Sequence, residues 1–421
     1  MLGKKKLVVA AILSVVGLSL SQTQIADAAG VTGKIEVFSW WTSGSENAAL
    51  QTILASLHKS NPSLNIINEA VAGGAGTNAK QVLATRLAAG NTPDTWQTHP
   101  GGDLQGYINQ HATTDLTSFY AANGWTKVMP KALIASVTSG GKIWSVLTGV
   151  HRGNVWWTNK ADLAKAGVTF GASTTWPQML AAAKKLQAVG ITPFCLGDNG
   201  IWAAQHVVEN ILVGELGATE YNNLAQGKAS WNDPKVTQAL NDFATFLTMT
   251  NKDHQALQWT DAVADLASGS CAINTMGDWA YGELLVKQKK VDGVDFGYTV
   301  LGDPNTFVTV SDSFVIGSHS QNPAAAKAFL RAIMSPAVQI AFSKAKGSSP
   351  VRTDVSTKTL GKYQQMTAKV LAHGVSVASL TQGQQLVPPA VGQAYADATT
   401  IFEGNQDATA FEKSMDTATG K

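Results

Sequence analysis

The sequence of 421 residues has few charged side chains. Only 14% of its residues are Asp, Glu, Lys or Arg, against about 25% in typical soluble proteins. The 31 basic and 29 acidic residues nearly cancel, and Lys and Arg form no basic patch of the kind that nucleic-acid binding requires. We therefore expect an uncharged partner and no nucleic-acid binding. A chain of this length is expected to form about two domains.

The sequence signatures of common catalytic sites are also missing. The eight histidines include no pair four residues apart and no HExxH motif, so a zinc hydrolase has no support. There is no GxSxG nucleophile elbow. We predict no catalytic residue, metal or cofactor. One enzymatic alternative stays open: a secreted glycoside-active enzyme, with Asp278 and Glu283, or Glu46 and Asp312, paired across a cleft.

Cysteine is nearly absent. Cys195 and Cys271 are the two cysteines of the chain, and neither lies in a CxxC motif, which argues against redox catalysis. In an oxidising compartment the two can form a disulfide. Two buried free thiols are the alternative.

The N-terminus has the pattern of an export signal. Residues 4–6 are lysines, residues 7–20 are apolar, and residues 26–28 (Ala-Asp-Ala) offer a small-x-small cleavage site. This pattern predicts a signal peptide over residues 1–28 and an exported, periplasmic protein, which we expect to be a monomer. A retained N-terminal anchor is the alternative. The apolar run is short for a membrane span, and no later segment resembles one.

The order of predicted elements indicates an α/β fold. Strands are predicted at 34–40, 64–71, 143–150, 154–158, 193–196 and 307–316, helices at 48–58, 82–89, 178–189, 236–248 and 323–334, and a mostly helical tail at 357–411. Strand and helix alternate in the first hundred residues, which favours a mostly parallel sheet. Because no flexible linker divides the chain, we expect two packed lobes with crossovers between them.

Tryptophan is abundant, with twelve residues. A sugar ring packs its apolar face on an indole ring, and its hydroxyls bond to carboxylates and amides. Trp40 and Trp41 follow the first predicted strand and Glu46 opens the next helix, where ligands of open α/β sheets bind. We predict sugar contacts there, with a core position for one Trp as the alternative. Trp156 and Trp157 lie inside a predicted strand and are predicted to be core.

Three further clusters combine polar and aromatic residues. Gln97 and His99 follow a turn, and Asp278 directly precedes Trp279. Asp312 interrupts an apolar strand, where a buried acid is costly unless it is hydrogen-bonded. That cost indicates a ligand partner, although a helix N-terminus would serve equally well.

Taken in order, these clusters resemble the extracellular solute-binding proteins of sugar ABC importers, and most closely the glucose/mannose-binding branch. The segments that carry the resemblance are 37–44 (VFSWWTSG), 90–93 with 97–99, 149–154 (GVHRGN), 276–280 (MGDWA), 311–314 (SDSF) and 346–354 (KGSSPVRTD). The likeness extends over essentially the whole chain after residue 28.

The resemblance implies a two-lobed α/β fold of the type II periplasmic-binding-protein class, with a hinge and the ligand in the cleft. We expect residues 29–143 plus 306–348 in the N-terminal lobe and residues 144–305 plus 349–421 in the C-terminal lobe. The implied ligand contacts are Trp40, Trp41, Glu46, Gln97, His99, Trp259, Asp278, Trp279, Asp312 and Gln382, with Trp202 as a further candidate.

The implied function is capture of a monosaccharide, a glucose-like aldose, and its delivery to the membrane permease of an ABC importer, without catalysis. A chemoreceptor sugar carrier is a second alternative. Two departures from the branch leave the sugar's identity open. Gln382 stands where the branch has His, and Tyr281 stands where it has Lys. Glutamine donates and accepts hydrogen bonds as histidine does, but with a different reach and without titrating.

Overall fold

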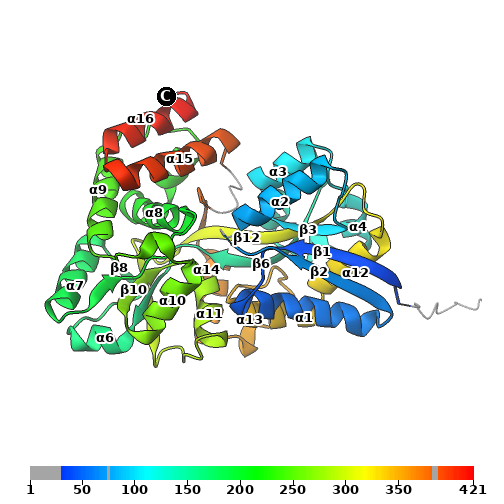
Figure 1. Ribbon diagram of the computed structural model, residues 1–421, viewed down its shortest axis with the longest axis horizontal. Coiled ribbons are helices and arrows are strands. Elements are labelled where there is room, and N and C mark those ends of the chain that lie inside the picture. Colours follow the sequence, from blue (N-terminus) through cyan, green and yellow to red (C-terminus); the bar gives the residue numbers. More distant parts are fainter. Residues whose placement is uncertain (1–29, 74–75, 382–386) are drawn as a thin grey trace, which may run out of the picture.

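The computed structural model describes residues 30–73, 76–381 and 387–421. It has the predicted two-lobed α/β fold, with the lobes side by side (Figure 1). The predicted signal peptide and Gln382 lie outside the described residues. Within the described part, no helix is long and apolar enough to cross a membrane.

The first lobe contains a six-stranded mixed sheet. Its order is β13-β12-β3-β1-β2, with β6 also pairing with β12. The strands β1, β2 and β3 are parallel to one another, as the alternation of elements predicted, and β12 runs antiparallel to β3 and β6. The strands are β1 (Gly33–Ser39), β2 (Leu64–Ala70), β3 (Thr95–Thr98), β6 (Val146–Arg152), β12 (Thr306–Ile316) and β13 (Val375–Ala378).

The second lobe contains a five-stranded sheet in the order β8-β11-β7-β10-β9. Its central strand β7 is antiparallel to both of its neighbours, β10 and β11. At the two edges of the sheet, β9 is parallel to β10 and β8 is parallel to β11. Its strands are β7 (Trp156–Asn159), β8 (Ser173–Thr174), β9 (Thr192–Phe194), β10 (Cys271–Thr275) and β11 (Phe296–Leu301), and a separate small ribbon joins β4 (Thr138–Ser139) to β5 (Lys142–Ile143).

Helices cover both sheets. The first lobe carries α1 (Gly44–Ser60), α2 (Thr77–Ala88), α3 (Gly102–Asn109), α4 (Thr117–Ala122), α5 (Lys131–Ser136), α12 (Pro323–Ile333), α13 (Pro336–Lys346) and the 3-10 turn η2 (Trp125–Lys127). The second lobe carries α6 (Lys160–Lys165), α7 (Trp176–Ala188), α8 (Trp202–Ala225), α9 (Pro234–Thr248), α10 (Trp259–Ser268), α11 (Trp279–Val286), α15 (Pro389–Asn405) and α16 (Ala408–Thr419). Three further elements are α14 (Lys362–His373) and the 3-10 turns η3 (His254–Ala256) and η4 (Thr357–Thr359).

The local sequence explains several helix ends. Asn159 accepts hydrogen bonds from two backbone amides at the start of α6, and Asp233 does the same for Lys235 at the start of α9. Thr175 and Gln178 form a capping box at the start of α7. Such caps satisfy backbone amides that have no partner within the helix.

Two hydrophobic cores fill the lobes, and β12 contributes to both. Val308 and Val310 pack in the second core, whereas Phe314 packs in the first. All eleven residues of β12 are buried. Because the long strand is shared in this way, the lobe boundaries given above remain a prediction. Figure 1 shows β12 and β6 running from one lobe toward the other.

The two cysteines form a disulfide. Cys195 follows β9 and Cys271 begins the neighbouring strand β10, and their Cα atoms lie 5.5 Å apart. Of the two alternatives that the sequence left open, the structure has the disulfide. It closes a loop of 76 residues within the second lobe, which contributes roughly 4 kcal/mol in the chain-entropy description.

Candidate functional site

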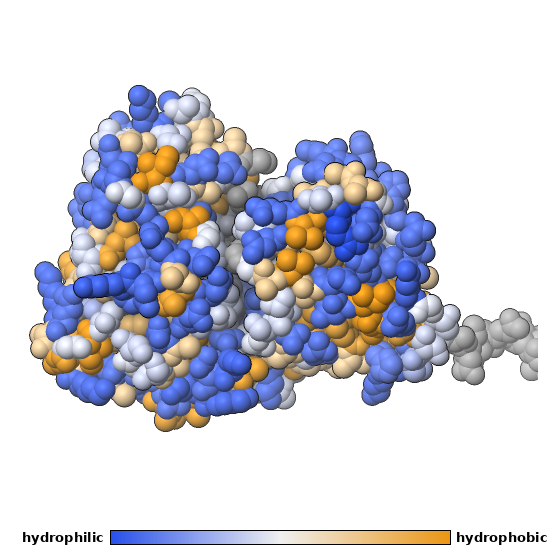
Figure 2. Space-filling view, in the orientation of Figure 1, coloured by the Kyte–Doolittle hydropathy of each residue, from blue (hydrophilic) through white to orange (hydrophobic). Residues whose placement is uncertain are grey.

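A small cavity lies where the two lobes meet. Its volume is about 330 Å³ including the open space at its mouth, and its walls are Trp40, Glu46, His99, Trp202, Trp259, Trp279, Val310, Asp312 and Lys346. Figure 2 shows the groove that separates the lobes on one face of the molecule.

The end of β1 is fixed to β3 and β12 by one amide side chain. Gln97 accepts a hydrogen bond from the backbone N–H of Trp40 at 3.1 Å. Its Nε2 donates to Oδ1 of Asp312 at 2.8 Å. Gln97 is buried beside the cavity and is not among its lining residues. It therefore sets the position of two lining residues, one indole and one carboxylate.

His99 reaches the same wall from the end of β3. Its Nδ1 lies 2.9 Å from Oδ2 of Asp103, its Nε2 lies 3.7 Å from Oδ1 of Asp312, and its ring lies 5.2 Å from that of Trp40. Burial alone would raise the pKa of Asp103, but Lys80 and His99 outweigh burial and hold it well below its usual range. Because Asp103 is a charged acceptor, it holds the proton of His99 on Nδ1.

Glu46 and Lys346 form an ion pair at the cavity wall. Nζ of Lys346 lies 2.5 Å from Oε1 of Glu46, and it also lies 5.4 Å from the centre of the Trp41 ring. Burial raises the pKa of Glu46, and the lysine offsets part of that rise. Lys346 ends α13 and is only 2% exposed. Its charge is thus held against the first turn of α1.

Three tryptophans form most of the second lobe's side of the cavity. Trp202 and Trp279 have ring centres 6.4 Å apart and inclined at 49°, and Trp259 lines the cavity beside them. A Cβ atom on Gly277 would lie 2.1 Å from the Trp279 ring, so this ring can fold back only over a glycine. Each of these rings is buried for more than nine-tenths of its surface.

Asp278 is fully buried and does not line the cavity. Its Oδ1 lies 2.5 Å from Nδ1 of His151, and its Oδ2 accepts the backbone N–H of Arg152 at 3.0 Å. Burial raises the pKa of Asp278, against the effect of His151. The ring of His151 meets the edge of Trp279 at 5.5 Å. Asp278 therefore acts on the cavity through the groups that it positions.

The structure brings six of the ten predicted contacts into one cavity: Trp40, Glu46, His99, Trp259, Trp279 and Asp312. Gln97 lies one hydrogen bond behind its walls, whereas Asp278 is bonded to His151, whose ring packs against Trp279. Trp41 is fully buried among the first core, against Phe314 and Phe342. The candidate Trp202 does line the cavity. Trp156 and Trp157 are buried in the second core, as predicted.

Lys346 lines the cavity but was not among the predicted contacts. A signal was present: the segment 346–354 carries the resemblance described above and begins with a lysine at the end of an apolar helix. Val310 was also missed, because an apolar residue in an apolar strand gives no signal of its own.

Two α/β lobes with a small aromatic and polar cavity between them define the class of ligand-capturing, two-lobed solute-binding proteins. The chain belongs to the family of bacterial extracellular solute-binding proteins, whose family model matches residues 41–340. It is 33% identical over 385 residues to a probable sugar-binding periplasmic protein of Rhizobium meliloti, covering 89% of this chain and 90% of that protein.

Two further similarities agree with this family. An uncharacterized ABC transporter extracellular-binding protein of Pyrococcus horikoshii is 33% identical over 339 residues, which cover 80% of this chain and 76% of that protein. Among solved structures, a chitin oligosaccharide binding protein superposes with a TM-score of 0.78 over 93% of this chain and 100% of that chain. At 19% identity, that structure supports the fold alone.

Proposed function

We propose that the chain captures a small sugar outside the cytoplasm and delivers it to the membrane permease of an ABC importer. The observation that carries the proposal is the composition of the cavity. Indole rings from both lobes stand beside hydrogen-bonding groups, namely Glu46, His99 and Asp312. This is the combination that a sugar's apolar face and its rim of hydroxyls require.

The sugar that fits this proposal is a monosaccharide, with a glucose-like aldose as the first candidate. The cavity is small and has nine lining residues, which supports a small ligand. The similar chitin oligosaccharide binding protein bears the name of a longer ligand, so oligosaccharides belong in the test. Neutral sugars also match the low charge of the chain.

Binding at the meeting point of the lobes gives a mechanism for signalling to a permease. The ligand contacts both lobes only when they are together, so its differential affinity favours the closed form. The lobes touch directly: the backbone N–H of Ser45 on α1 donates to Oε2 of Glu283 on α11 at 3.0 Å. Closure fixes the relative position of the two lobes' outer surfaces, which a permease then recognises.

The carboxylates are proposed to bind hydroxyls and not to cleave a glycosidic bond. Glu46 is paired with Lys346, and Asp278 is paired with His151. The enzymatic alternative needs one free nucleophile and one acid at a set separation. The raised pKa values of Glu46 and Asp278 are a feature that a general acid would share, and the experiment below separates the two functions.

The test is a titration of the intrinsic tryptophan fluorescence with mono-, di- and oligosaccharides, followed by recovery of the bound ligand. Four indoles line the cavity, so occupancy should change the emission. We expect a saturable change with at least one monosaccharide, which is recovered intact. A new reducing end released from a glycoside would show catalysis instead. Stronger binding of oligosaccharides than of monosaccharides would contradict the proposal that the ligand is a monosaccharide.

A further inference from the structure

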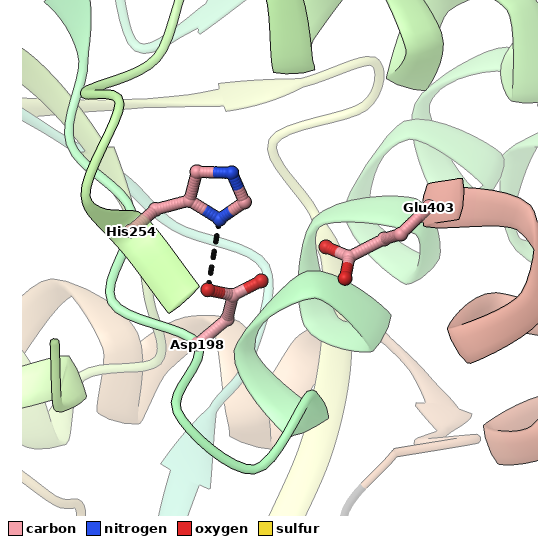
Figure 3. A group of neighbouring side chains, drawn as sticks. All are labelled: Asp198, His254 and Glu403. Atoms are coloured by element: carbon pink, nitrogen blue, oxygen red, sulfur yellow. Dashed lines mark hydrogen bonds and ion pairs between the residues drawn. The ribbon is translucent and has the colours of Figure 1, made fainter. Parts of the chain in front are cut away.

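A second cluster of polar groups lies in the second lobe, apart from the cavity walls. Asp198 comes from the loop between β9 and α8, His254 begins η3, and Glu403 lies near the end of α15. Figure 3 shows the His254 ring and the Glu403 carboxylate both turned toward Asp198. One ligand atom from each of the three lies within 4.8 Å of the others.

The two carboxylates face each other without a donor between them. Asp198 is 3% exposed, and its Oδ2 is buried with no hydrogen-bond partner among the described residues. Oε1 of Glu403 is in the same condition. A buried carboxylate oxygen without a partner costs several kcal/mol in general, so the pair requires a cation or a shared proton.

The backbone around the cluster is already held in place. The N–H of Asp198 donates to the carbonyl of His254 at 3.0 Å, and the N–H of Asn199 donates to the carbonyl of Leu257 at 2.9 Å. Nδ1 of His254 lies 2.9 Å from Oδ1 of Asp198. Two of the three ligand-bearing segments are therefore tied together, and α15 supplies the third.

We propose that Asp198, His254 and Glu403 form a binding site for one divalent transition-metal cation of the zinc type. With bonds of 2.0–2.2 Å, two ligands of a tetrahedral ion lie about 3.3–3.6 Å apart. The observed limit of 4.8 Å is wider by roughly 1.2–1.5 Å, so the side chains must rotate inward to hold the ion. The cation would neutralise both facing carboxylates.

The ligand set selects the class of metal. Calcium and magnesium prefer sites built from oxygen alone, whereas an imidazole nitrogen with two carboxylates suits zinc, nickel or cobalt. His254 and Glu403 are partly exposed, which leaves a path for the ion and a fourth position for water. No sequence pattern indicates the site, because its ligands lie far apart in the chain and form no motif.

The site has a structural consequence for the cavity. The loop that carries Asp198 leads directly into Trp202 at the start of α8, and Ile201 in this loop has a positive φ of 66°. A cation held by this loop, η3 and α15 would restrain the segment that positions a cavity indole. Sugar binding does not depend on the proposal, since the walls form without it.

The test uses the full chain without an affinity tag, treated with a chelator and then titrated calorimetrically with zinc chloride. We expect one ion per chain and a higher melting temperature with Zn²⁺, and a much smaller effect with Ca²⁺ or Mg²⁺. Glu403→Gln and His254→Ala should each weaken zinc binding at least about tenfold. His319→Ala, which removes an exposed imidazole elsewhere, should leave it unchanged.

Glu403→Gln also guards against a folding artefact. The substitution removes the repulsion between the carboxylates of Asp198 and Glu403. The metal-free variant should therefore have a melting temperature no lower than that of the metal-free parent, and zinc should no longer raise it. No one-to-one zinc binding by the parent chain, or binding that survives both ligand substitutions, would overturn the proposal and leave a shared proton between the carboxyls. Preference for Ca²⁺ would overturn the assigned class of metal.

Discussion

The two walls of the cavity differ in kind. The first lobe supplies most of the hydrogen-bonding groups, with Glu46, His99, Asp312 and Lys346, and a single indole, Trp40. The second lobe supplies three indoles, Trp202, Trp259 and Trp279. Nearly all the groups able to tell one hydroxyl from another stand on one side, and most of the surface able to cover an apolar ring face stands on the other.

This difference suggests that the polar wall determines which sugar binds and the aromatic wall contributes affinity for any sugar. Hydrogen bonds depend on direction, so a wall that is rich in them discriminates between sugars that differ at one hydroxyl. Burial of apolar surface is non-directional and contributes to every sugar in a similar way. Substitutions in the polar wall should therefore change the ranking of sugars, and substitutions in the aromatic wall should weaken binding across the whole set.

The largest effect is expected from Lys346→Met, which removes the positive charge from the polar wall. Breaking a buried ion pair costs about 3–5 kcal/mol. Glu46 keeps 19% of its side-chain surface exposed, so we expect about 2–3 kcal/mol of lost stability, measured by urea unfolding. The double variant Glu46→Gln/Lys346→Met should recover much of it, because no lone carboxylate remains.

The pH dependence of this variant has a defined sign. Burial raises the pKa of Glu46 above its ordinary 4.5, and without the lysine the rise is greater. A carboxyl group whose pKa is raised in the folded state favours folding only while it is protonated. Stability is therefore lost as pH rises through the folded pKa. The deficit of Lys346→Met should shrink toward pH 4. An equal deficit at all pH values would show that packing, not charge, makes the pair important.

The next effect is expected from Asp312→Asn. The new side chain can still accept from Gln97, so the wall should keep its shape. One charged hydrogen bond to a hydroxyl contributes about 1.5–3 kcal/mol, or about 10- to 150-fold in affinity. Calorimetry with several monosaccharides should show unequal losses. Asp397→Asn, at an exposed carboxylate on α15 that bonds only Gln393 among the described residues, is the matched control. Equal losses for every sugar would contradict a discriminating wall.

Several residues of the polar wall and its support could be predicted from local sequence. The strand that contains Asp312 was predicted at 307–316 and found at Thr306–Ile316, and the cost of a buried acid marked the residue. Trp40 was marked by its place at the carboxyl end of β1. Gln97 and His99 were marked as polar residues that follow a turn; the strand β3, which contains Gln97 and ends just before His99, was not predicted.

Long-range partners could not be predicted in the same way. Glu46 and Lys346 are 300 residues apart, and Asp278 and His151 are 127 apart; no local pattern encodes such pairs. Trp40 and Trp41 could not be told apart either. Neighbouring residues near a strand end point to opposite sides, but only the packing of α1 and α13 shows which side is the cavity.

A smaller effect is expected from Trp279→Phe in the aromatic wall. The phenyl ring keeps an apolar plate but covers less of a sugar, which should cost about 0.5–1.5 kcal/mol, or about two- to tenfold in affinity. The loss should be similar for every sugar that binds. Trp125→Phe, in the first core against Phe119 and Tyr120, is the matched control and should leave affinity unchanged. A reordered preference among sugars would show that this indole also discriminates.

The smallest effect is expected one contact behind the polar wall, from Asp103→Asn. The charge of Asp103 holds the His99 proton on Nδ1, and its loss frees the ring to present either nitrogen to the cavity. We expect a loss of about 0.5–1 kcal/mol, or about two- to fivefold in affinity, by calorimetry.

Lys80→Met is the matched control for this substitution, because it removes the other partner of Asp103 and leaves the pair with His99 intact. It should change affinity less than Asp103→Asn does. The depressed pKa of Asp103 contributes stability that is present above the unfolded value and lost as pH falls through the folded one. Asp103→Asn should remove that part of the acid sensitivity. Complete loss of sugar binding would instead mean that Asp103 touches the ligand itself, and the polar wall would then extend onto α3.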